Sequence, residues 1–139
     1  AQLKLGNDVY DASGKLIAAT ADVCMPELKS RSYAYCSDTI YTDSFLDIIH
    51  GVDLLYHEST FLDELADRAT KTFHTTAKQA GLIAKKAEVG KLIIGHFSSR
   101  YYDIEPFLEE AGAIFKNTFL GIEGSTFSIS DQIEDETCN

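Results

Sequence analysis

The stretch VDLLYHEST, residues 52–60, decides the class of fold, and KLIIGHF, residues 91–97, repeats its pattern. Each stretch places a short apolar run before polar side chains with acid–base or metal-binding chemistry. A helical pattern separates the two. Short buried strands that alternate with helices are typical of βαβ units, whose parallel strands form one sheet. We therefore predict an α/β fold with a largely parallel or mixed sheet.

The same alternation extends in both directions along the chain. SYAYC, residues 32–36, predicts a strand, and residues 42–51 predict a short helix that Thr42 or Asp43 caps and Gly51 ends. The other elements that we expect are a short helix over 62–69, a long helix that Thr75 or Thr76 caps and Gly90 ends, a helix over 104–115, and strands over 118–122 and 125–129.

The composition is that of one globular domain. The chain has 139 residues, of which 45% are hydrophobic, so it is long enough to bury a core. We expect one domain over residues 1–130 and an acidic, flexible tail over 131–139. The 12 basic and 22 acidic residues give a net charge of −10. This charge disfavours binding of nucleic acid or anionic membranes over the whole surface, so any nucleic-acid contact is expected to be local.

The cysteines and the apolar runs bear on the compartment. Cys24, Cys36 and Cys138 are odd in number and far apart, which suggests neither a disulfide framework nor a structural zinc site. No apolar run approaches the length that spans a bilayer, and the first residues have no leader pattern. We therefore expect reduced thiols in a cytoplasmic protein.

Polar side chains follow three of the predicted strands. Asp38 follows the first, His57 and Glu58 end the second, and His96 ends the third, while His74 lies just before the long helix. Because the carboxyl ends of strands in α/β sheets share one crevice, we expect these side chains to meet there. Carboxylates and imidazoles together suit zinc binding or acid–base chemistry near neutral pH.

Each of these residues also has an ordinary structural explanation. The two carboxylates could cap turns, and His57 and His96 could be core histidines bonded to backbone carbonyls. His74 could pack at the start of the helix, and Arg100 could form a salt bridge or contact a phosphate. Spacing alone leaves these alternatives open.

Four ordered motifs resemble ribonuclease Z, the tRNA 3′-processing endonuclease of the metallo-β-lactamase fold. They are YCSDT, YHESTF, FHTTAKQAGLIAKKA and KLIIGHFSSRY, within residues 32–101. The flanks resemble this family more loosely. The resemblance implies that the chain is the C-terminal half of a metallo-β-lactamase αββα sandwich, with a mixed sheet and flanking helices.

The resemblance also implies a role for each site residue. Asp38 would bridge two zinc ions, and His96 would bind one of them. His74 would lie near the scissile phosphate as proton donor or transition-state stabiliser, with Glu58 orienting it and His57 in the same loop behind the site. Arg100 is a weaker candidate for substrate binding. The implied reaction removes the 3′ trailer from precursor tRNA by metal-activated hydroxide attack and leaves a 3′ hydroxyl on the tRNA, commonly in a homodimer.

The sequence departs from the family before Asp38. The family has a His-x-His-x-Asp-His run and a further histidine there, whereas this chain has no histidine before position 50. Ser37 also stands where many relatives have glycine. Because catalytic zinc normally has three protein ligands, we expect the chain to be incomplete and inactive without a missing N-terminal half. Two alternatives stay open, namely another metallo-β-lactamase-fold phosphodiesterase or hydrolase, and a non-catalytic interaction domain.

Overall fold

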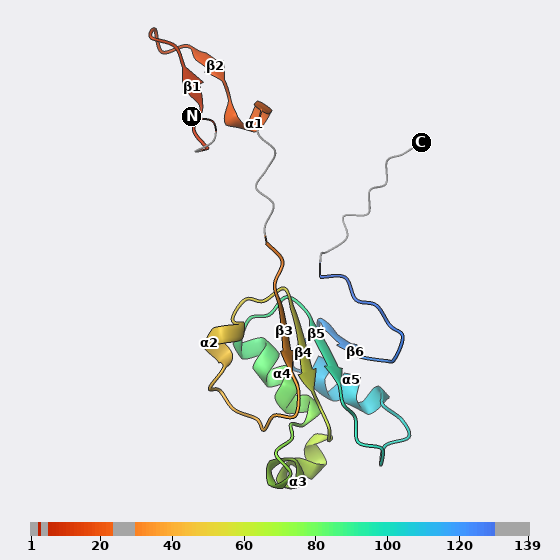
Figure 1. Ribbon diagram of the computed structural model, residues 1–139. Coiled ribbons are helices and arrows are strands. Elements are labelled where there is room, and N and C mark those ends of the chain that lie inside the picture. Colours follow the sequence, from red (N-terminus) through yellow and green to blue (C-terminus); the bar gives the residue numbers. More distant parts are fainter. Residues whose placement is uncertain (1–2, 4–5, 24–29, 130–139) are drawn as a thin grey trace, which may run out of the picture. The chain divides into compact units, whose positions relative to one another are not determined.

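The computed structural model describes residues 3, 6–23 and 30–129 of the chain. It divides the chain into two compact units, residues 1–30 and 31–139. The second unit contains a four-stranded sheet and the helices that pack on it (Figure 1). The acidic tail predicted over 131–139 lies outside the described residues, and the prediction of one domain over 1–130 stays a prediction.

The four strands of the large unit are parallel and lie side by side in chain order. They are β3 (Tyr33–Cys36), β4 (Leu54–Glu58), β5 (Leu92–Gly95) and β6 (Thr118–Leu120). In the register of the sheet, Cys36 faces His57 and Glu58 faces Gly95. The carboxyl ends of three strands therefore lie at one edge, as the sequence predicted, and the residues after them enter one region.

Helices cover one face of this sheet (Figure 1). They are α2 (Leu46–Ile49), α4 (Ala77–Lys86) and α5 (Glu105–Gly112). Helix α3 (Ala66–Lys71), which directly follows the 3-10 turn η2 (Asp63–Leu65), lies beyond the carboxyl ends of the strands (Figure 1). Leu55, Leu92 and Ile94 of the sheet are fully buried and belong to one core with residues of α4 and α5. Each such side chain contributes about 1.5–3 kcal/mol through burial.

The start of α4 is fixed by a capping box. The Thr76 hydroxyl accepts from the backbone N–H of Gln79, and the Gln79 side chain accepts from the backbone N–H of Thr76. Along α4, Gly81 allows close packing, because a Cβ there would lie 2.8 Å from the carbonyl oxygen of Ala111 in α5. The cap and the packing together hold the loop before α4 against the end of the sheet.

The structure corrects several predicted boundaries. Helix α2 begins later than residue 42, and neither Thr42 nor Asp43 caps it. The left-handed residue that ends α4 is Glu88, with φ of 52°, and not Gly90. Gly90 is required for another reason, since a Cβ there would lie 2.6 Å from the Asp53 carbonyl oxygen. Residues 125–129 form no strand.

The small unit contains a hairpin that the sequence analysis did not predict. Strands β1 (Val9–Tyr10) and β2 (Leu16–Ala18) pair antiparallel, and a short helix, α1 (Thr20–Val23), follows them. The turn is held by Asp11, whose Oδ1 accepts from the backbone N–H groups of Ser13 and Lys15. The stretch Asp11-Ala-Ser-Gly14 contains residues that favour turns, and it marks this hairpin in the sequence.

The capping box yields a stability prediction. Replacing Thr76 by alanine removes the hydroxyl that accepts from the backbone N–H of Gln79. We therefore expect the free energy of unfolding to fall by about 1–2 kcal/mol. Denaturant titration followed by circular dichroism measures the change. Thr70→Ala, at an exposed site whose hydroxyl only donates back to the Ala66 carbonyl, is the matched control. An equal loss in both variants would contradict the capping role.

Candidate functional site

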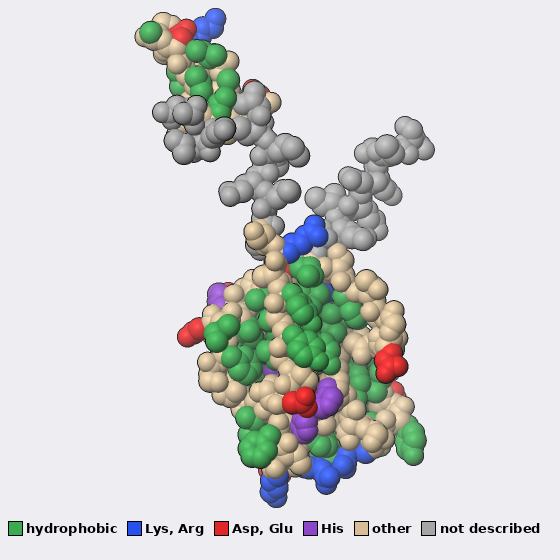
Figure 2. All heavy atoms as spheres, viewed as in Figure 1, with side chains coloured by type: hydrophobic (Ala, Val, Ile, Leu, Met, Phe, Trp, Pro, Cys, Tyr) green, Lys and Arg blue, Asp and Glu red, His purple; other side chains and the backbone are tan. Residues whose placement is uncertain are grey.

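The loops after β3 and β5 deliver Asp38 and His96 in strained backbone conformations. Asp38 has φ of 49° and His96 has φ of 63°, and such left-handed values are uncommon for residues other than glycine. Strained residues of this kind are frequent at functional sites. They persist only where the surrounding structure holds the backbone in place. Figure 2 shows histidine and acidic side chains gathered on one face of this unit.

Asp38, His74 and His96 form one cluster. Each offers a ligand atom, and these three atoms all lie within 4.8 Å of one another. The Nε2 atom of His96 is 3.6 Å from Oδ1 of Asp38, and the side chains of these two residues are 44% and 72% exposed. Carboxylate and imidazole groups, such as those of Asp38 and His96, suit a borderline metal ion such as zinc. The donor set therefore fits the metal that the sequence motifs imply.

Glu58 lies beneath this cluster with no exposed surface. Its Oε1 atom accepts from the backbone N–H of Thr39 at 3.0 Å and from Nδ1 of His74 at 2.9 Å. Its Oε2 atom accepts from the backbone N–H and from the hydroxyl of Thr60, at 3.1 and 2.6 Å. A buried carboxylate is costly unless its oxygens are bonded, and here both are. Glu58 thus fixes the ring of His74.

The loop that carries His74 is anchored on both sides. The residue before it, Phe73, has φ of 60°, and the backbone N–H of His74 donates to the Ala69 carbonyl at 2.8 Å. The residue after it, Thr75, donates its hydroxyl to the Thr39 carbonyl at 2.6 Å. The imidazole is therefore held at 23% side-chain exposure, close to His96, at a ring separation of 5.3 Å.

His57 lies apart from this cluster. It is fully buried, Phe45 lies beside its ring, and its Nδ1 atom is 2.7 Å from the carbonyl oxygen of Glu58. Its Nε2 atom has no hydrogen-bond partner among the described residues. Burial lowers the pKa of His57. A neutral ring that donates Nδ1–H to this carbonyl holds the backbone of Glu58, and the supporting role that the motif implies for His57 stays a prediction.

Arg100 and His74 both contact the ring of Phe61. The guanidinium carbon of Arg100 is 5.4 Å from the centroid of the Phe61 ring, and that ring meets His74 edge-on at 6.2 Å. The Nε atom of Arg100 donates to the Ser98 hydroxyl. This exposed cation remains available for a phosphate group near the cluster.

Sequence reasoning missed Thr60 and Thr39. Thr60 is 7% exposed, and its hydroxyl contacts the side chains of Glu58, His74 and His96. Thr39 contributes only its backbone N–H and carbonyl. Both residues stand in the motifs quoted above. Thr39 directly follows Asp38, and Thr60 is two residues after Glu58. A polar residue that follows a site residue within a motif was the available signal.

The chain was compared with known proteins. No family model matches it. It is 68% identical over 136 residues to the ribonuclease Z of Cytophaga hutchinsonii, and 48% identical over 128 residues to that of Parabacteroides distasonis. These matches cover 98% and 92% of the chain, but 44% and 42% of the relatives. The chain therefore spans less than half the length of the curated relatives it matches.

Two solved structures share the fold. The metallo-β-lactamase fold protein YhfI of Bacillus subtilis matches with a TM-score of 0.60 and 28% identity, over 66% of this chain and 36% of that one. The short form of human tRNase Z matches with a TM-score of 0.52 and 27% identity, over 68% of this chain and 31% of that one. The described sheet and helices are thus part of a metallo-β-lactamase fold, which confirms the predicted fold class.

The curated relatives point to one kind of protein within the metallo-β-lactamase fold class. In sequence and in fold the chain matches part of ribonuclease Z, as the four ordered motifs predicted.

The burial of His57 predicts a dependence of stability on pH. Because burial lowers its pKa below the usual value of 6.5, the unfolded chain binds more protons than the folded chain once the pH falls below about 6.5. The stabilisation that comes from burying the neutral His57 ring is therefore complete above about pH 6.5. It is lost as the pH falls toward the lowered pKa of His57. We expect His57→Asn, which does not titrate, to show a weaker loss of stability between about pH 7 and 5 than the unchanged protein.

The matched control is His50→Asn, because His50 is exposed on the surface near Glu88. Unfolding midpoints measured in denaturant at several pH values compare the three proteins. If His57→Asn loses stability with pH as steeply as the other two, burial of a neutral imidazole is not the cause.

Proposed function

We propose that this chain is the C-terminal part of a zinc-dependent endoribonuclease that removes the 3′ trailer from precursor tRNA. The observation that carries the proposal is the hydrogen-bonded pair of Glu58 and His74 beside the ligand atoms of Asp38 and His96. This arrangement combines metal binding with proton transfer, which hydrolysis of a phosphodiester needs. The relatives named ribonuclease Z and the human tRNase Z support the RNA substrate.

Asp38 and His96 are the proposed metal ligands in this chain. Both are partly exposed and approach one another at 3.6 Å between Nε2 and Oδ1. When bound, a pair of zinc ions would polarise the phosphate and lower the pKa of a water molecule to near 7. This chain's contribution is to hold one carboxylate and one imidazole in place at the ends of β3 and β5.

His74 is the proposed proton donor, and Glu58 positions it. The bond from Nδ1 to the buried carboxylate points the other ring nitrogen, Nε2, away from Glu58. A proton on Nε2 can pass to the 3′ oxygen of the tRNA as the bond from phosphorus to that oxygen breaks. The products are then a tRNA with a 3′ hydroxyl and a trailer with a 5′ phosphate. Arg100, across the Phe61 ring, would contact a phosphate of the substrate.

Two observations indicate that the site needs further chain. Asp38 and His96 supply fewer ligands than catalytic zinc normally has. In addition, the sheet face away from α4 and α5 carries apolar side chains at its surface (Figure 2). Tyr33 and Tyr35 of β3 are 52% and 62% exposed. We propose that the rest of the same protein supplies the other ligands and covers this face.

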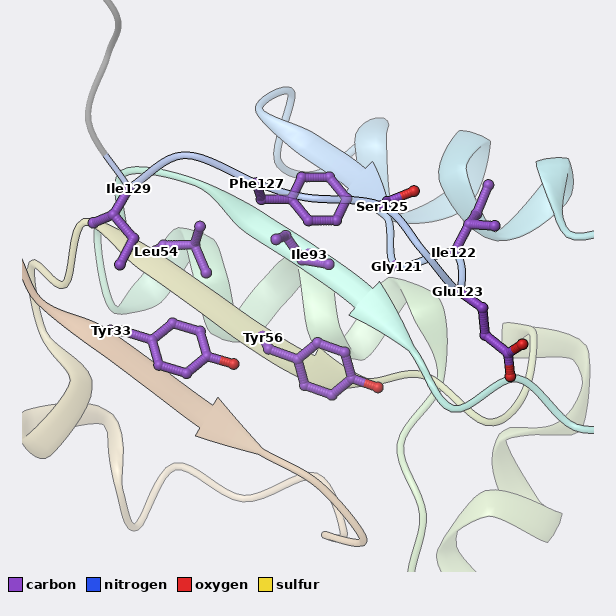
Figure 3. A pocket seen from close by; sticks show the side chains of 10 residues that line it. All are labelled: Tyr33, Leu54, Tyr56, Ile93, Gly121, Ile122, Glu123, Ser125, Phe127 and Ile129. Carbon is purple, nitrogen blue, oxygen red and sulfur yellow. The ribbon is translucent and has the colours of Figure 1, made fainter.

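The uncovered face is hollowed. The hollow has a volume of about 450 Å³, and Figure 3 shows the side chains that line it. Its floor is formed by strand residues Tyr33, Leu54, Tyr56 and Ile93, and its side by the segment 121–129. We propose that this apolar hollow is a packing surface for further chain, since exposed apolar patches mark interaction sites. It fits the inner face of a second sheet, as in the αββα sandwich that the motifs imply.

We also propose, from the sequence features described above, that the complete protein acts on precursor tRNA in the cytoplasm, and from the resemblance of its motifs that it forms a homodimer. No helix in the described part of the chain could span a membrane.

Cleavage of precursor tRNA tests the proposal. The protein extended at its N-terminus to the length of its relatives should release the trailer and leave a 3′ hydroxyl, and Asp38→Ala and His96→Ala should abolish this. The fold also occurs in a protein with another name, YhfI. One alternative is therefore another metallo-β-lactamase-fold phosphodiesterase or hydrolase. Hydrolysis of an aryl phosphodiester without cleavage of precursor tRNA would favour that alternative. If both variants keep their metal content and still cleave precursor tRNA, this chain would instead be a non-catalytic domain of the protein.

His74 separates metal binding from turnover. Because its Nδ1 is bonded to Glu58 and it is proposed as a proton donor, His74→Ala in the extended protein should keep its zinc but lose roughly 10²–10⁴-fold in turnover. Elemental analysis and a cleavage assay give the two values. His50→Ala, at the exposed end of α2, should change neither. Loss of zinc from His74→Ala would show instead that His74 is a ligand.

A further inference from the structure

Thr60 occupies the centre of the site. It follows β4 by two residues, is 7% exposed, and has its backbone bonded on both sides. Its N–H donates to Oε2 of Glu58 at 3.1 Å, and its carbonyl accepts from the N–H of Ser98 at 3.1 Å. The backbone of Thr60 is therefore fixed between the strand that carries Glu58 and the loop that follows His96.

The hydroxyl of Thr60 contacts three site residues at once. It donates to Oε2 of Glu58 at 2.6 Å, and it lies 3.2 Å from Nδ1 of His74 and 3.0 Å from Nδ1 of His96. This hydroxyl is the point at which the Glu58–His74 pair meets a proposed metal ligand.

Counting protons determines the direction of each bond. A hydroxyl has one proton, and here it is donated to the carboxylate of Glu58. The Thr60 Oγ1 atom can then offer the imidazoles only its lone pairs. The contact with His96 is therefore a hydrogen bond in which Nδ1–H of His96 is the donor. The neutral ring then carries a lone pair on Nε2, the atom 3.6 Å from Oδ1 of Asp38. That distance is too long for a hydrogen bond, so Asp38 does not place a competing proton on Nε2.

We propose that the Thr60 hydroxyl is a positioning group that fixes the Nδ1–H tautomer of His96 and so makes its Nε2 atom available to a metal ion. Through the same oxygen, His96 is linked to the Glu58–His74 pair. Neutral imidazole binds a metal through the nitrogen that carries no proton, and the partner of the other nitrogen selects the tautomer. The inference rests on the proposed function only in taking His96 as a metal ligand.

Two substitutions at position 60 separate the hydroxyl from the shape of the side chain. Thr60→Val keeps the branched shape and removes the hydroxyl, whereas Thr60→Ser keeps the hydroxyl. In the extended protein, we expect Thr60→Val to bind zinc about 10–100-fold more weakly, measured by competition with a chelator, and Thr60→Ser to bind nearly as the unchanged protein does. Retention of full zinc affinity in a folded Thr60→Val would overturn the proposal.

The tautomer can be observed without metal or substrate. Long-range ¹H–¹⁵N spectra of the metal-free, histidine-labelled protein should show His96 as Nδ1–H, and Thr60→Val should show a mixture of both forms. His57, whose Nδ1 is bonded to the Glu58 carbonyl, is an internal control whose tautomer should not change. If His96 of the unchanged protein is the Nε2–H form, the proposal is wrong, even if Thr60→Val does not fold.

These results are independent of the substrate. A protein with Nδ1–H His96 and Thr60-dependent zinc affinity that leaves precursor tRNA intact would sustain the role of Thr60 and refute the proposed function. A protein that cleaves precursor tRNA with His96 in the Nε2–H form would do the reverse.

Discussion

The carboxylate of Glu58 has no exposed surface and accepts four hydrogen bonds from three segments of the chain. The donors come from Thr39 after β3, Thr60 after β4, and His74 before α4. Leaving a buried hydrogen-bonding group without its partner costs about 1–3 kcal/mol, so this carboxylate constrains all three segments together. Through the Thr60 hydroxyl the constraint reaches His96 after β5. The geometry of the site follows from this one buried acid.

Much of this arrangement could be predicted from the sequence. Apolar runs predicted β3, β4 and β5, and their parallel order brought the residues after them together. Thr75 or Thr76 and the helical pattern after them predicted the start of α4, and the structure shows that Thr76 is the cap. The ordered motifs predicted that Asp38, His74 and His96 would be neighbours, and the structure places their ligand atoms within 4.8 Å. The roles proposed for these residues await experiment.

Other features depend on contacts that local sequence does not contain. Gly90 was predicted to end α4, but its small size is needed against the Asp53 carbonyl, which is distant in sequence. Residues 125–129 have a strand-like pattern, yet Phe127 and Ile129 instead line the hollow on the sheet. The motif marked the position of Thr60, but its role depends on contacts with three side chains from separate elements, which the motif does not contain.

The central claim is that this chain carries part of a zinc site that further chain completes. Elemental analysis of zinc tests it most directly, on the 139-residue chain and on the chain extended to the length of its relatives. The account predicts well below one tightly bound zinc ion for the first and about two for the second. Two tightly bound ions in the 139-residue chain, or none in the extended protein, would contradict it.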